Sequence, residues 1–140
     1  MKLVIFLIFF PLITFISGCS ITTIAEFDHY EGRTNPSNWQ KVGEENGNSH
    51  YVDIENIKSH EGFVYYWELI DFKEAIYGAL SRISKFKANC TDKEKANLDV
   101  SAYTGQMGKY IKINEGKYSG TRFFDSSKSI TMNFVCDHIK

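Results

Sequence analysis

Alternation of apolar and polar residues, the pattern of a half-buried β-strand, recurs through most of the chain after residue 37. The most apolar stretch reads "FVYYWELIDF" and is rich in the aromatic and β-branched residues that favour strands. The turn-rich segment "GEENGNS" precedes a short strand that leads into a helical turn at 53–57. The predicted strands lie at 51–54, 63–72, 78–90, 96–103 and 108–114.

The end of the chain has a different period. Ile130 and Phe134 recur at helical spacing with His138 or Ile139, and Asp125, Ser126 or Ser127 is the expected N-cap. The pattern therefore predicts an α+β domain: a small, mostly antiparallel sheet of about six strands that is covered by one C-terminal helix.

The first eighteen residues have the layout of a secretory signal peptide, with Lys2, an apolar run, and the small residues Ser17 and Gly18. A permanent transmembrane helix would need about 20 apolar residues. The run from Leu3 to Ile16 is shorter, and Pro11 would strain a helix there. We interpret residues 1–18 as a signal and not as a membrane span.

Ile16-Ser17-Gly18-Cys19 resembles the bacterial lipobox, which implies that Cys19 becomes the acylated first residue of the mature protein. The alternative is an ordinary signal peptide followed by a chance cysteine. Lipoproteins with an Asp after the cysteine are commonly retained in the inner membrane, so Ser20 favours the outer membrane. We expect a lipid-anchored tether at 19–36 and a folded domain at 37–140.

The two remaining cysteines, Cys90 and Cys136, lie inside the predicted domain. Export would place them in an oxidising compartment, so a single disulfide is the expected state. Metal binding is the weaker alternative, because only His138 lies close to either cysteine in sequence. We expect no metal and no cofactor apart from the covalent lipid on Cys19.

Charge and motifs argue against nucleic-acid binding and catalysis. The formal net charge is −1, which is not the basic footprint of a nucleic-acid-binding domain. No nucleophile elbow, phosphate loop or zinc-protease motif occurs, and the four histidines are scattered along the sequence. Glu68 and Asp71 are the best carboxylate pair, but a strand directs them to opposite faces. We expect no enzyme.

Two groups of residues are candidate contact surfaces. A locally basic region suits an acidic ligand such as a glycosaminoglycan-decorated glycoprotein, with an ordinary solvated strand face as the alternative. The aromatic residues of the longest strand suit either an interface or core packing, and core packing is the commoner role. The basic residues are Arg82, Lys85, Lys87, Lys93 and Lys95, and the aromatic residues are Tyr65, Tyr66, Trp67 and Phe72.

The order and spacing of "NWQKVG", "YVDIENI", "VYYWELIDF", "KFKANC", "YTGQMG" and "NFVCD" resemble the surface-adhesin protein E family, from Trp39 to Cys136. The resemblance implies a small antiparallel sheet with an attached helix and one disulfide. It also implies binding of host glycoproteins such as vitronectin and laminin, and pairing of an edge strand in a homodimer. The family supplies no binding motif that can be placed on named residues of this chain.

Two functions from different classes follow. The first is an outer-membrane lipoprotein that binds host extracellular-matrix or serum glycoproteins. The second is a periplasm-facing lipoprotein with a structural or inhibitory role, as in lipid-anchored lysozyme inhibitors. The sequence leaves open which face of the outer membrane the domain occupies.

Overall fold

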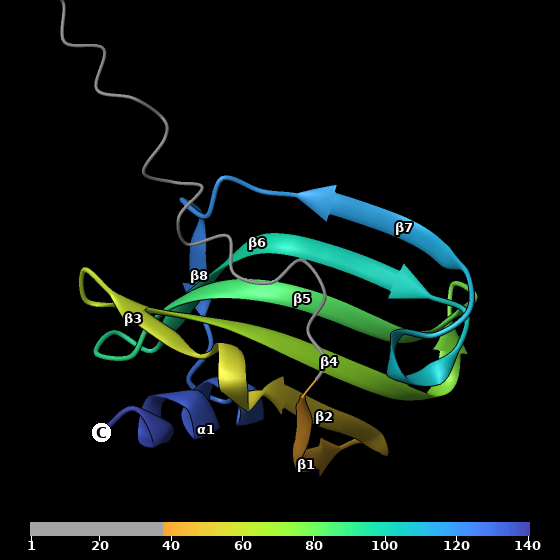
Figure 1. Ribbon diagram of the computed structural model, residues 1–140, viewed down its shortest axis with the longest axis horizontal. Coiled ribbons are helices and arrows are strands. Elements are labelled where there is room, and N and C mark those ends of the chain that lie inside the picture. The colour runs from red at the N-terminus through yellow and green to blue at the C-terminus, as the bar shows by residue number, and fades with distance from the viewer. Residues whose placement is uncertain (1–37) are drawn as a thin grey trace, which may run out of the picture. The chain divides into compact units, whose positions relative to one another are not determined.

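The computed structural model describes residues 38–140 as one curved antiparallel sheet with a helix against one of its faces (Figure 1). The predicted signal peptide, tether and acylated Cys19 lie outside the described residues. Among the residues that the structure describes, no helix is long and apolar enough to cross a bilayer.

The described sheet has eight strands in the order β1-β2-β4-β5-β6-β7, with β3 beside β4 and β8 beside β6. Every strand pairing in this sheet is antiparallel. The predicted fold class is confirmed. Three strands lie outside the predicted ranges: β1, which overlaps the turn-rich segment "GEENGNS", and β3 and β8, which have three residues each, too few to show an alternation in the sequence. The elements are β1 Trp39–Glu45, β2 Asn48–Asp53, the 3₁₀ turn η3 Ile54–Asn56, β3 Lys58–His60, β4 Phe63–Ile76, β5 Ala79–Asn89, β6 Glu94–Tyr103, the 3₁₀ turn η4 Gln106–Gly108, β7 Lys112–Lys117, β8 Phe123–Asp125 and α1 Ile130–His138.

Two-residue turns close the hairpins β1–β2 and β4–β5. Asn46-Gly47 and Tyr77-Gly78 have positive φ at both positions. This conformation matches the twist of the flanking strands and favours glycine at the second position. The β4–β5 turn allows β4 to continue to Ile76, beyond the predicted end at Phe72.

The main core lies between the sheet and α1. Apolar side chains from β2, β4 and β5 meet one face of the helix, and Tyr66 is fully buried among them. A fully buried aromatic ring contributes roughly 2–3 kcal/mol by its removal from water. The buried core residues are Val52, Val64, Tyr66, Phe86, Ala88, Met132, Val135 and Cys136.

The helix begins two residues later than the latest of the predicted caps. Ser129 is the N-cap, and its Oγ accepts a hydrogen bond from Met132 N at 3.3 Å. The predicted caps were wrong because these residues form the preceding turn, in which the Asp125 carboxylate accepts from Ser127 N at 2.9 Å. An Asx turn and a helix N-cap use the same side chains, so the sequence does not distinguish them.

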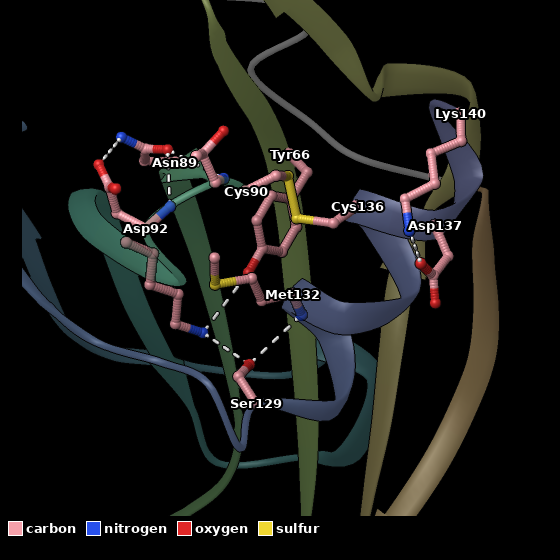
Figure 2. The surroundings of a disulfide bond; sticks show 11 residues. Tyr66, Asn89, Cys90, Asp92, Ser129, Met132, Cys136, Asp137 and Lys140 are labelled. Carbon is pink, nitrogen blue, oxygen red and sulfur yellow. Dashed lines mark hydrogen bonds and ion pairs between the residues drawn. A yellow bond between two sulfur atoms is a disulfide. The ribbon is translucent and has the colours of Figure 1, made fainter.

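The predicted disulfide is present. Cys90, which directly follows β5, is bonded to Cys136 of α1, and their Cα atoms are 5.6 Å apart. Figure 2 shows Tyr66 and Met132 beside the bridge, which therefore borders the main core. The bond fastens the helix to the sheet across 46 residues of sequence.

Removing this bond should destabilise the domain. For a closed loop of 46 residues, loop-closure entropy predicts that the double variant Cys90→Ser, Cys136→Ser loses about 4 kcal/mol of unfolding free energy. Urea unfolding of the full-length protein and of the double variant measures the difference. A Cys19→Ser variant is the matched control, and a loss below about 1 kcal/mol in the double variant would show that the bond constrains the unfolded chain little.

Candidate functional site

The helix covers a group of charged and polar residues that we call the Glu68 cluster: Glu68, Arg82, Lys95, Tyr66, Ser129 and Thr131. The side chains of Glu68 and Lys95 are 4 % and 8 % exposed, whereas that of Arg82 is 41 % exposed. Charged groups are rarely buried to this extent unless they are paired. Buried, coupled charges of this kind occur both in functional sites and in structural ion-pair networks.

Every polar side chain of the cluster has at least one partner, although the buried Arg82 Nε has none among the described residues. Lys95 Nζ lies 3.3 Å from Glu68 Oε2, 3.2 Å from Ser129 Oγ and 3.5 Å from Tyr66 OH. Thr131 Oγ1 donates to the same Glu68 oxygen, and Arg82 Nη2 lies 3.8 Å from Glu68 Oε1. The contacts occupy all three donors of the ammonium group, so Lys95 serves the packing of α1 rather than an external ligand.

Burial shifts the pKa values of two side chains in this cluster, Lys95 and Tyr66. Desolvation lowers the pKa of Lys95 below its usual 10.5, although the neighbouring Glu68 carboxylate acts in the opposite direction. Desolvation also raises the pKa of Tyr66 well above 10.0, and Glu68 adds to this effect. Both shifts follow from burial, and both groups belong to the contacts between the sheet and the start of α1.

An open hollow of about 320 Å³ borders the cluster at Lys95 and Ser129. Its remaining wall combines the carboxylates of Glu45 and Asp125 with Lys128 and the ring of Phe124. The two acidic and two basic groups balance, so the hollow offers no field of one sign to a charged ligand.

The structure does not bring the five predicted basic residues together. Arg82 and Lys95 join the Glu68 cluster on the helix side of the sheet. Lys85 and Lys87 alternate with Phe86 of the main core and therefore project from the opposite face. Lys93 is exposed in the β5–β6 turn. The strand alternation through 82–87 separates charges that are neighbours in the sequence.

Lys87 remains partly accessible and lies against two aromatic rings. Its Nζ is 4.0 Å from the ring centroid of Phe63 and 5.8 Å from that of Phe123, and the two rings are 5.7 Å apart. Lys85 Nζ lies 5.5 Å from the Trp67 ring, but that lysine is only 8 % exposed. Lys87, Phe63 and Phe123 form a small cationic and aromatic surface that we call the Lys87 surface.

The carboxylates of the longest strand do not form a catalytic pair. Glu68 faces the helix, whereas Asp71 faces the other side of the sheet and accepts a hydrogen bond from Met107 N at 2.7 Å. Both carboxylates are buried, Glu68 with Lys95 as its ion-pair partner and Asp71 with the backbone N–H of Met107 as its hydrogen-bond donor. In the part of the chain that the structure describes, no three His, Cys, Asp or Glu residues could hold a metal ion.

One sequence signal pointed toward the Glu68 cluster. A glutamate in the middle of the most apolar strand needs a cationic or hydrogen-bonding partner if the strand is buried. The sequence did not identify Lys95 as that partner, because Lys95 follows the polar stretch "TDKE" and resembles a solvated turn residue. In the structure β6 begins at Glu94, which directs Lys95 inward.

These features define a small disulfide-bonded sheet-and-helix domain. The family model for surface-adhesin protein E matches residues 39–137, and the chain belongs to this family. No curated protein matches the sequence.

Solved structures of protein E from Haemophilus influenzae have the same fold. Crystal form II matches with a TM-score of 0.52 and 13 % identity, over 73 % of this chain and 89 % of that one. The selenomethionine form matches with a TM-score of 0.53 and 14 % identity, over 74 % of this chain and 85 % of that one. At this identity the likeness concerns the fold. The expected family and fold are confirmed.

Tyr66→Phe should reduce the loss of stability at alkaline pH. The pKa of Tyr66 is raised above 10.0 in the folded protein, so the unfolded chain releases this proton first. The contribution of Tyr66 to the unfolding free energy is therefore fully present below pH 10.0. Above that pH it falls by about 1 kcal/mol per pH unit. Urea unfolding between pH 9 and 11 measures the two slopes.

The matched control is Tyr77→Phe, because Tyr77 is 100 % exposed. Its slope should equal that of the wild type. Equal slopes for wild type and Tyr66→Phe would contradict the raised pKa of Tyr66.

Proposed function

We propose that this chain is an outer-membrane lipoprotein, anchored by acyl chains on Cys19, whose domain binds host extracellular-matrix or serum glycoproteins of the vitronectin or laminin kind. The observation that carries the proposal is the adhesin family match over residues 39–137, together with a lipobox-like segment upstream of it at 16–19. A non-enzymatic role agrees with the family and with the structural use of Glu68 and Lys95.

The Lys87 surface is our candidate contact for an acidic glycoprotein. A lysine that lies over one ring and beside a second combines an ammonium group with apolar area, and aromatic residues are enriched at protein interfaces. Exposed Lys93 can add long-range attraction. Arg82, Lys85 and Lys95 are assigned to internal contacts instead.

Lipid anchoring predicts that Cys19→Ala moves the protein from the membrane fraction to the soluble fraction. Stable anchoring needs more than one acyl chain, at about 0.8 kcal/mol per buried methylene, and all of these chains are lost with the sulfur. Fractionation of the native host followed by immunoblotting measures the change. Ser20→Asp is the companion variant, and we expect it to stay membrane-bound but to shift to the inner membrane.

The orientation of the domain separates the two functions. Protease added to intact cells should degrade the domain if it faces outward as an adhesin. Protection in intact cells, with degradation after permeabilisation, would instead assign the periplasm-facing structural or inhibitory role.

Lys87→Ala should weaken binding to immobilised matrix glycoprotein by a factor of about 1.5–5, because an exposed ion pair between the Lys87 ammonium group and an acidic group of the glycoprotein contributes roughly 0.2–1 kcal/mol. Surface plasmon resonance at low and moderate salt measures the affinity. Lys140→Ala is the matched control, because Lys140 is a distant, exposed lysine paired with Asp137. Equal affinities for wild type and Lys87→Ala would remove the Lys87 surface from the proposal.

A further inference from the structure

Strand β7 lies at an open edge of the described sheet. It is the last strand of the sheet order, and β6 is its one neighbour among the described strands. All residues of β7 except the half-buried Gly116 are exposed. An edge of this kind presents backbone N–H and C=O groups that can pair with another strand.

The hydrogen-bond pattern identifies which β7 groups point outward. Tyr118 N donates to Leu98 O at 2.9 Å in the ladder in which Gly116 pairs with Val100. Antiparallel pairs alternate between bonded and non-bonded positions, so the N–H groups of Asn114 and Gly116 face β6. The N–H groups of Glu115 and Lys117 therefore point away from the sheet.

Exposed apolar side chains gather at the end of the sheet where β7 begins. Five of the eight exposed large hydrophobic residues lie at the end of β4, in the β4–β5 turn, in the connection after β6 or in β7 itself. Figure 1 shows the β4–β5 turn and this connection at the same end of the sheet. A Cβ placed on Gly78 would lie 3.9 Å from Ile113 Cδ1, so the turn adjoins β7. The five are Ile76 (46 %), Tyr77 (100 %), Tyr110 (85 %), Ile111 (68 %) and Ile113 (44 %).

The sheet holds this apolar end in place. Asp71 accepts a hydrogen bond from Met107 N, and the buried Ser81 hydroxyl accepts one from Gly108 N at 3.0 Å and donates one to Gly105 O. Tyr77 and Tyr110 have the left-handed φ values 49° and 64°. Residues in this conformation persist where their surroundings fix them, so the two tyrosines are presented by a pre-organised backbone.

Charge indicates what this edge accepts. Lys112 is paired with Glu115 at 2.7 Å, and Lys109 and Lys117 leave the edge with a net positive charge. Lysines on an edge oppose pairing with a second copy of the same strand but attract an acidic segment. A bilayer would cover the apolar residues yet leave the outward backbone groups without partners.

We propose that the β7 edge is a strand-addition site for an extended, acidic segment of another protein with alternating apolar side chains. The segment pairs with the outward backbone groups of β7 and places apolar side chains beside Ile111 and Ile113. Main-chain pairing supplies affinity and the apolar end supplies selectivity. This surface is separate from the Lys87 surface and goes beyond the proposed function.

The test uses phage-displayed random peptides of roughly 12 residues, selected on the full-length protein in detergent micelles. Selected peptides should alternate apolar and acidic residues. A synthetic selected peptide is then titrated by fluorescence anisotropy against the wild type, Glu115→Pro and Glu115→Ala. Proline removes the outward N–H at a position where β6 has no need of it, whereas alanine removes only the side chain.

We expect Glu115→Pro to weaken binding by at least about tenfold, which corresponds to a lost main-chain pairing, and Glu115→Ala by less than about threefold. Ile111→Thr, which keeps a β-branched side chain, should weaken binding as well. Thermal melting followed by circular dichroism verifies that each variant is folded. Equal affinities for Glu115→Pro and Glu115→Ala would overturn the proposal, as would a selection that yields no alternating peptide.

Two further results would also overturn it. The first is a dimer in sedimentation velocity that Glu115→Pro dissociates, because a second copy of the chain would then be the strand that pairs with β7. The second is binding to anionic phosphatidylglycerol vesicles that Ile111→Thr abolishes. The outcome is independent of host-glycoprotein binding: peptide binding without matrix binding rejects the proposed function alone, and matrix binding without peptide binding rejects the strand-addition site alone.

Discussion

The attachment of α1 to the sheet is the constraint on which the domain depends. A helix of nine residues is too short to be stable by itself. It is held by apolar contacts around Tyr66, by its Ser129 cap and by the bond from Cys136 to Cys90. Tyr66 and Phe86 pack against α1 in the main core, so without the helix their rings would be exposed to water on this face of the sheet.

The Glu68 cluster makes this attachment specific rather than merely strong. Buried ion pairs contribute little net stability, because the desolvation of each charge offsets their attraction, but removal of one partner is costly. Thr131 and Ser129 of the helix region complete the hydrogen bonds of Glu68 and Lys95. A helix docked in another register would leave these charges without partners, so the cluster favours one arrangement.

Much of the fold was predictable from the sequence, whereas the distribution of its charges was not. Alternation located the long strands, and the distant cysteines predicted the bridge that Cys90 and Cys136 form. The basic residues were grouped by their proximity in sequence, but a period of two sends Lys87 and Arg82 to opposite faces. The burial of Lys95 was not predicted, because the first residues of β6 are charged and resemble a solvated turn. The apolar end beside β7 was missed because Tyr77 and Ile111 lie in separate loops that only the fold brings together.

The position of the bridge also orders the steps by which the domain matures. All eight described strands precede Cys136, and Cys90 stands 46 residues before it. If the chain is translocated from its N-terminus, Cys90 emerges before its partner, while β6, β7 and β8 are still to come. Until its partner arrives, it is open to mixed disulfides with thiols of other proteins. Under such translocation the Cys90–Cys136 bond can form only late, and an oxidoreductase that holds Cys90 in a mixed disulfide must release it before the bond forms.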